Sequence, residues 1–123
     1  MNGNNLMIDT NIALYLLSGD ETIAKLLQNR SIYISFITEL ELLGFKGIEE
    51  KQLKLINEFV ENCTVIDLND KIKKHTIELK RKYRLKLPDA IIAATSISMN
   101  LHFISADQDF EKISELYFIK YEV

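Results

Sequence analysis

The chain has 123 residues, enough for one domain with a hydrophobic core and too few for two ordinary domains. Hydrophobic residues make up 47% of the chain and charged residues 27%, a balance typical of globular proteins that argues against a disordered chain. The formal net charge of −3 supplies no general attraction to nucleic acid, so a polyanionic partner would have to meet a local basic patch or bound cations.

The single cysteine and the hydropathy pattern indicate a cytoplasmic protein. Cys63 has no second cysteine for an intramolecular disulfide, which fits a reducing compartment. No apolar run approaches the roughly 20 residues that a membrane-spanning helix needs. The first residues lack a basic segment followed by an apolar stretch, so we do not expect secretion.

Strands and helices alternate in the predicted order of elements. Short apolar or β-branched runs predict strands, while apolar positions three or four residues apart, with capping residues before them, predict helices. In chain order these patterns predict a strand over 6–9, helices over 10–17 and from Asp20 to 27, a strand over 32–35, helices over 36–45 and 49–61, a strand over 64–68, helices over 70–83 and 87–100, and strands over 102–105 and 117–120. We therefore expect a single α/β domain over residues 1–123, with a parallel β-sheet flanked by α-helices in an α/β/α sandwich.

Four acidic residues lie where predicted elements begin or end. Asp9 ends the first strand and Glu41 lies in the helix after the second strand. Asp89 opens a late helix, and Asp107 follows the fourth strand. Functional groups of parallel α/β sheets gather at the carboxyl ends of the strands, so we expect these carboxylates to converge. An unpaired charge directly after the buried run 6–8 would be costly, which favours a shared role for the four acids.

Each acid also has a purely structural explanation. Asp9 could cap the helix that follows it, Asp89 could interact with the positive end of its helix dipole, and Asp107 could be a turn residue. Glu41 could be a solvent-exposed helix acid. The helical period does not choose between Glu41 and Glu39, because both flank the apolar face of their helix.

Four segments of the chain, taken together, resemble the PIN domain. Their sequences are IDTN (8–11), ISFITELELLG (34–44), LPDAIIAAT (87–95) and SADQDF (105–110). Each segment alone is a weak signal, but the four occur in the family's order and at its approximate spacing. The resemblance covers essentially the whole chain and is closest to the toxin ribonucleases of type II toxin–antitoxin pairs, the VapC-like proteins.

The resemblance implies a role for each matching residue. It assigns catalysis and metal binding to four carboxylates, those of Asp9, Glu41, Asp89 and Asp107. It thereby selects Glu41 over its neighbour Glu39. It adds Asp109 as a further metal position and Asn11 and Ser105 as polar supports of the site. Ser105 stands where the family often has threonine, a change that keeps the hydroxyl group.

Four carboxylates in one pocket require neutralisation. Two carboxylates about 5 Å apart repel by roughly 3 kcal/mol at an effective dielectric constant of 20, so cations or protons must compensate. A site with only oxygen ligands suits Mg²⁺ or Mn²⁺ rather than Zn²⁺. Such ions can activate water and stabilise charge on a phosphodiester, so they are the cofactors we expect.

One local excess of positive charge precedes Asp89, formed by Lys71, Lys73, Lys74, Lys80, Arg81, Lys82, Arg84 and Lys86. It is equally well explained as a solvated helix face and as a track for the RNA backbone. On the second interpretation, Arg81, Arg84 and Lys86 bind RNA close to the acidic site.

The predicted function is a Mg²⁺- or Mn²⁺-dependent endoribonuclease that acts as the toxin of a toxin–antitoxin pair. The resemblance implies RNA as substrate, a cognate antitoxin, a homodimer and a hetero-oligomer with the antitoxin. Candidate surfaces for these partners are the apolar residues Leu14, Leu17, Leu26, Leu27, Leu42, Leu43 and Phe45. Two alternatives are an RNA-processing PIN nuclease without an antitoxin and a non-catalytic RNA-binding PIN-like module.

Overall fold

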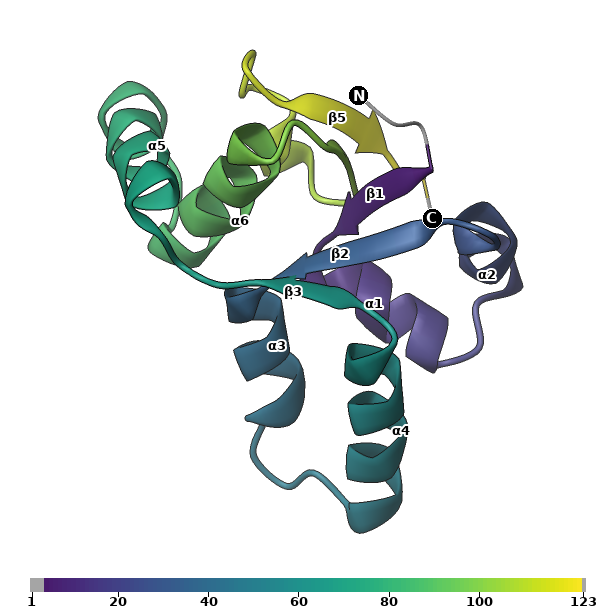
Figure 1. The fold of residues 1–123 in the computed structure, drawn as a ribbon. Helices are drawn as coiled ribbons and strands as arrows, with labels where there is room; N and C mark the ends of the chain where they lie inside the picture. Colours follow the sequence, from purple (N-terminus) through teal and green to yellow (C-terminus); the bar gives the residue numbers. More distant parts are fainter. Residues whose placement is uncertain (1–3, 123) are drawn as a thin grey trace.

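The computed structural model of the protein describes residues 4–122. The strands are β1 (Asn5–Ile8), β2 (Ser31–Ser35), β3 (Thr64–Ile66), β4 (His102–Ser105) and β5 (Tyr117–Lys120). The helices are α1 (Thr10–Leu17), α2 (Glu21–Leu27), α3 (Phe36–Leu43), α4 (Glu50–Glu61), α5 (Asp70–Lys82) and α6 (Leu87–Ser98), with a 3₁₀ turn η1 (Gln108–Phe110). Every predicted strand and helix is therefore present (Figure 1).

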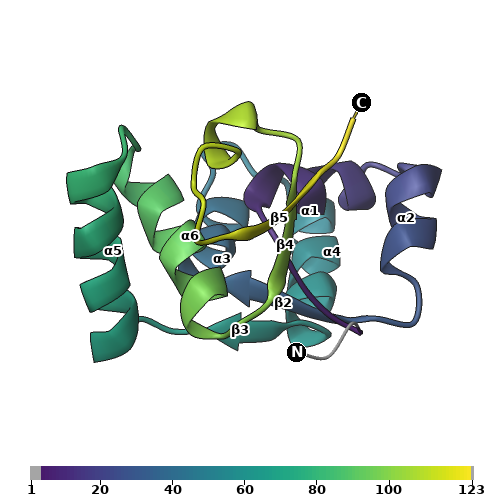
Figure 2. The same ribbon diagram turned by 90° about the horizontal axis from the view of Figure 1, so that it is seen from above.

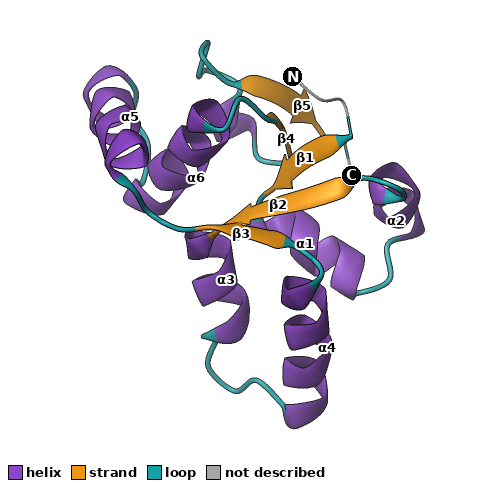
Figure 3. Ribbon diagram, viewed as in Figure 1, coloured by secondary structure: helices purple, strands orange, loops and turns teal. Residues whose placement is uncertain are grey.

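All five strands form one parallel sheet in the order β3-β2-β1-β4-β5. β1 lies at the centre, and its neighbours β2 and β4 come from segments far apart in the sequence. Helices cover both faces, as Figure 3 shows by colour and Figure 2 shows from above. The predicted parallel sheet between helical layers is confirmed.

The two faces of the sheet bury two separate apolar clusters. Met7 and Phe103 point into a cluster made with α5 and α6, whereas Ile8 and Ile104 point into one made with α1 to α4. Successive residues of a strand point to opposite faces, so the unbroken apolar runs in β1 and β4 follow from burial on both sides.

Several predicted element ends lie one or two residues from the observed ones, among them the end of α6 at Ser98 rather than residue 100, and two residues of the predicted partner surface are buried. The helix expected to reach Phe45 ends at Leu43, with Gly44 as its C-cap; a Cβ at Gly44 would lie 2.6 Å from the Leu40 carbonyl oxygen, so this position requires glycine. The strand expected over 64–68 stops at Ile66 at the sheet edge. Leu27 and Leu42, proposed as partner surfaces, are 6% and 1% exposed and belong to the core.

No helix in the described part of the chain is long and apolar enough to cross a bilayer.

Candidate active site

Four carboxylates line one cavity at the carboxyl ends of the central strands. The cavity has a volume of about 190 Å³ and is lined by Asp9, Thr10, Asn11, Glu41, Asp89, Ile92, Asp107 and Phe110. Its acids come from the end of β1, from α3, from the first turn of α6 and from the segment after β4. The structure thus brings the four predicted acids together, and Asn11 with them.

Asp9 is the most enclosed of the four acids, with 6% of its surface exposed. One oxygen, Oδ1, accepts a hydrogen bond of 3.0 Å from the backbone N–H of Ile12 and so caps α1. The other oxygen, Oδ2, accepts a hydrogen bond from the hydroxyl of Ser105. Burial raises the pKa of Asp9, the two hydrogen bonds oppose this rise, and the Asp107 charge adds to it.

Ser105 connects two acids of the cavity. Its buried hydroxyl donates to Asp9 and accepts a hydrogen bond of 3.0 Å from the backbone N–H of Asp107. Asp107 in turn caps η1 by accepting a bond of 2.9 Å from the backbone N–H of Asp109. A single side chain of β4 therefore aligns the carboxylates that follow β1 and β4, which fits the supporting role predicted for Ser105.

Glu41 is held by a residue that the sequence reasoning missed. The hydroxyl of Thr10 donates to Oε1 of Glu41 and lies 3.2 Å from the hydroxyl oxygen of Thr38, which is buried. Glu39, the alternative acid on the same helix, is not among the residues that line the cavity. The position of Thr10 directly after the strand-end Asp9 is the sequence signal that could have indicated its role.

The pKa of Asp89 is raised by partial burial and by all three of the other acids in the cavity. Partial burial is the main cause that raises its pKa, and repulsion from Asp107, Glu41 and Asp9 raises it further. The nearby ammonium group of Lys86 acts in the opposite direction and lowers the pKa of Asp89. Three other carboxylates are therefore close enough to disfavour the ionised form of Asp89.

Asp109 lies in a second cavity beside the first. That cavity has a volume of about 320 Å³, shares Asp89 with the acidic cavity and is lined by Arg84, Leu85, Lys86, Asp89, Asp109 and Lys112. Two of the predicted RNA-binding residues, Arg84 and Lys86, are thus beside the acids. Arg81 lies exposed on α5 and lines neither cavity, while Lys112 was missed because it stands alone in the sequence.

The donor atoms of the acidic cavity suit a hard divalent cation. Its charged lining consists of carboxylates, without histidine or cysteine. Burial is the main cause that raises the pKa of Asp9 and Asp89, and the neighbouring carboxylates raise the pKa of both further. Within residues 4–122, no group of three or more His, Cys, Asp or Glu side chains lies close enough together to hold a metal ion without rearrangement. Mg²⁺ commonly keeps several water ligands and takes only one or two carboxylates, so an open acidic cavity fits such an ion.

Known proteins share both the sequence pattern and the fold. A family model described as PIN domain matches residues 6–116. Among solved structures, a toxin–antitoxin complex from Klebsiella pneumoniae contains a chain with 30% identity and a TM-score of 0.82, and the match covers 96% of this chain and 99% of that one.

Two further structures are similar over nearly their whole length. The VapBC-1 structure from nontypeable Haemophilus influenzae has 27% identity and a TM-score of 0.75, covering 94% of this chain and 97% of that chain. A chain of VapBC2 from Rickettsia felis, bound to a DNA fragment from its promoter, has 22% identity and a TM-score of 0.83. The match covers 96% of this chain and 99% of that chain, and at this identity it supports only the fold. No curated protein matches the chain. Because the family model spans most of its length, the chain belongs to the PIN domain family.

Proposed function

We propose that the protein is a metal-dependent endoribonuclease that hydrolyses RNA phosphodiester bonds in the cytoplasm as the toxin of a toxin–antitoxin pair. The observation that carries this proposal is the convergence of Asp9, Glu41, Asp89 and Asp107 on one cavity. Membership of the PIN domain family supports nuclease chemistry, and similarity to chains of toxin–antitoxin complexes supports the biological role.

The four carboxylates would hold Mg²⁺ or Mn²⁺. A bound ion of this kind would lower the pKa of a water molecule and stabilise negative charge on the phosphodiester. The surrounding residues keep the acids in place: Ser105 aligns Asp9 with Asp107, and Thr10 holds Glu41. Asn11 is exposed at the cavity, where its amide group can bond to the sugar or phosphate of the RNA.

The basic residues before α6 would guide the RNA backbone. Arg84 and Lys86 line the cavity next to the acids, and Arg81 extends the positive charge along the end of α5. Asp109 shares that second cavity, so its predicted part in metal binding has less geometric support than that of the other four acids.

Replacing Asp9 by asparagine tests the catalytic proposal. Asparagine also caps helices, so Asp9→Asn should keep the start of α1 while it removes one negative ligand. With Mg²⁺ or Mn²⁺ present, we expect RNA cleavage to fall by at least roughly 100-fold, because several kcal/mol of charge stabilisation are lost. EDTA should abolish wild-type cleavage, and Asp67→Asn, at an exposed position, should cleave normally. Cleavage by Asp9→Asn at the wild-type rate would disprove the assignment.

An apolar groove offers a site for the antitoxin. It has a volume of about 210 Å³, lies between α1 and α4, and is lined by Leu14, Leu17, Ser18, Phe45, Gln52, Leu55 and Ile56. Leu14, Phe45 and Leu55 are 41%, 41% and 49% exposed, which suits them to receive an apolar segment of a partner. We propose that the chain forms a homodimer and that antitoxin binding adds a hetero-oligomer, which light scattering can measure.

The toxin role predicts an effect in cells that an RNA-processing role does not. Expression of the chain alone should arrest growth, and co-expression of a cognate antitoxin should restore it. The Asp9→Asn variant, expressed at the same level, should not arrest growth. Normal growth with active wild-type enzyme would instead favour a processing nuclease.

A further inference from the structure

The cavity that shares Asp89 with the acidic cavity has the opposite balance of charge. Three cationic side chains, those of Arg84, Lys86 and Lys112, line it together with the carboxylates of Asp89 and Asp109. The acidic cavity contains four carboxylates and no cation. A strand of RNA that reaches the acids from this side would therefore pass from a net positive to a net negative environment.

The connection between α5 and α6 that forms this cavity is fixed at several points. The ammonium group of Lys112 donates a hydrogen bond of 2.6 Å to the carbonyl oxygen of Arg84. Lys80 donates another of 2.6 Å to the carbonyl oxygen of Leu85. Lys112 belongs to the segment after η1, and Lys80 belongs to α5. Both bind backbone atoms of the connection, so the backbone that carries Arg84 and Lys86 is held in place.

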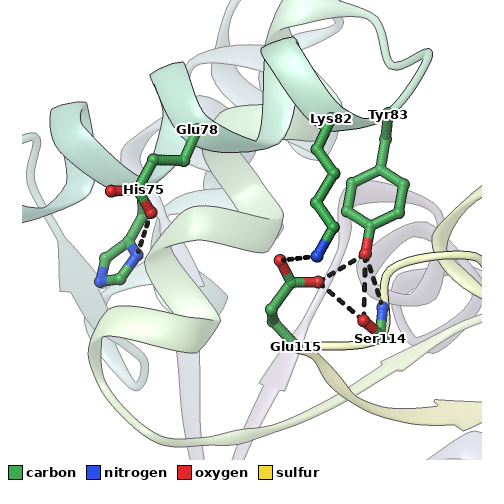
Figure 4. A network of polar contacts seen from close by, with 6 residues as sticks. All are labelled: His75, Glu78, Lys82, Tyr83, Ser114 and Glu115. Atoms are coloured by element: carbon green, nitrogen blue, oxygen red, sulfur yellow. Dashed lines mark hydrogen bonds and ion pairs between the residues drawn. The ribbon is translucent and has the colours of Figure 1, made fainter.

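A polar network at the end of α5 adds a further attachment (Figure 4). The hydroxyl of Tyr83 donates to Glu115 at 2.6 Å and accepts from the backbone N–H of Ser114 at 3.2 Å. Lys82 forms an ion pair with the same glutamate at 3.2 Å. The chain segment that carries Lys112 is thereby held against the end of α5, and the positions of the cavity's cations depend on this contact.

The cationic groups keep donors available for a ligand. Within residues 4–122, the guanidinium of Arg84 and the ammonium of Lys86 make no hydrogen bond or ion pair. Lys112 uses one of its three N–H donors for the Arg84 carbonyl. Guanidinium and ammonium groups that converge on one cavity are suited to phosphate oxygens.

We propose that the cavity lined by Arg84, Lys86 and Lys112 binds a backbone phosphate of the RNA next to the bond that is cut. Lys112 both fixes the connection at Arg84 and contributes a donor to the phosphate. This inference rests on the proposed ribonuclease function and adds to it the side from which the substrate enters. The Asp109 carboxylate weakens the interaction, because it repels the same phosphate.

Binding of RNA in the absence of metal tests the subsite separately from catalysis. The probe is a fluorescein-labelled single-stranded RNA of mixed sequence, titrated in EDTA at several salt concentrations. Lys112→Gln and Arg84→Gln should each weaken binding about 5-fold and reduce the slope of log K against log salt by about 0.7, the loss of one phosphate contact on a single strand. Arg84→Gln keeps the backbone carbonyl that Lys112 binds, so its effect does not depend on loosening the connection.

Two further variants complete the comparison. Lys54→Gln removes an exposed charge on α4, outside both cavities, and should keep the wild-type slope. Asp109→Asn should tighten binding about 2-fold, because it removes a like charge from the cavity. Equal salt slopes for the wild type, Lys112→Gln and Arg84→Gln would overturn the subsite, even where the wild type cleaves RNA in Mg²⁺. A wild type that neither binds nor cleaves RNA would overturn both the subsite and the proposed function.

Discussion

Asp9 combines a helix cap with a place in the proposed metal site. Its Oδ1 atom caps α1, and its Oδ2 atom binds Ser105 at the border of the acidic cavity. The two explanations that the sequence allowed are therefore compatible, because a carboxylate has two oxygens with separate partners. The cap also limits the rotation of the carboxylate, which holds it toward the other acids.

Asp89→Asn should stabilise the metal-free protein. The raised pKa of Asp89 means that folding disfavours the ionised carboxylate. The carboxylate therefore lowers the free energy of unfolding at neutral pH, and this loss of stability disappears as pH falls below the ordinary carboxyl pKa. After allowance for solvent screening, we expect Asp89→Asn to raise the free energy of unfolding by about 0.5 kcal/mol at pH 7, or Tm by roughly 2 °C. Thermal unfolding in EDTA measures this difference.

Metal should reverse the order of stability. On the proposed metal site, Mg²⁺ or Mn²⁺ should bind the folded wild type and raise its Tm, whereas Asp89→Asn lacks one ligand charge and should gain less. Asp67→Asn serves as control, because Asp67 is exposed and lines neither cavity. A metal-free Asp89→Asn protein that is less stable than the wild type at pH 7 would contradict the proposed repulsion.

The sequence indicated which acids to consider but not all of their neighbours. The family pattern selected Glu41, and the structure places this residue, not Glu39, in the cavity. Lys112 could not be predicted, since its contact crosses 28 positions of sequence; Thr10 stands next to Asp9, but its contact with Glu41 crosses 31 positions. Asp109 follows Asp107 closely in sequence, yet the 3₁₀ turn directs it into the neighbouring cavity.

The contact between α5 and the segment before β5 depends on Glu115. Its hydrogen bond from Tyr83, together with its contacts with Lys82 and Ser114, lowers the pKa of Glu115 from 4.5 to about 2. A carboxylate with a lowered pKa contributes stability above its unfolded pKa, and this contribution is lost as pH falls from about 4.5 to about 2.

Glu115→Gln should therefore lower stability at pH 7 and not at pH 2. Because 39% of the Glu115 side chain is exposed, solvent screens its contacts. We therefore expect the free energy of unfolding to fall by only about 1 kcal/mol at pH 7. Urea unfolding between pH 2 and pH 7 measures the difference, with the exposed Glu61→Gln as control. A constant difference across this range would show that the ionised Glu115 is not the source of the stability.

Element types were easier to predict than element ends. Helices and strands follow from apolar periodicity, which burial on both faces of the sheet imposes. At the end of α3, Gly44 donates its backbone N–H to the Leu40 carbonyl and leaves no room for a Cβ, and the end of β3 depends on its place at the sheet edge. Such causes involve three-dimensional neighbours that a linear pattern does not contain.

For the whole molecule, the layered architecture separates the sites of the two proposed functions. The acidic cavity lies at the carboxyl ends of the strands, while the apolar groove lies between α1 and α4 on one helical layer. Within residues 4–122 no residue lines both, so the proposed partner binding and the proposed RNA cleavage should be altered separately by substitution.

Leu55→Glu should impair antitoxin binding without impairing cleavage. A charged side chain in the apolar groove would lose its water on complex formation, and we expect at least a 10-fold weaker complex. Co-purification with the antitoxin and a separate RNA cleavage assay measure the two effects. Met99→Glu, at a comparably exposed position outside the groove, is the control, and an unchanged complex for Leu55→Glu would exclude the groove as the docking surface.

The hydrogen bond between Ser105 and Asp9 joins residues 96 positions apart. β4, which carries Ser105, lies directly beside β1, so this pair of the sheet forms only after residues 102–105 have been synthesised. An incomplete chain on the ribosome that ends before residue 107 lacks both the last acid of the cavity and its alignment with the first. If the proposed nuclease function holds, a nascent chain therefore cannot cleave nucleic acid before Asp107 has left the ribosome and β4 has paired with β1.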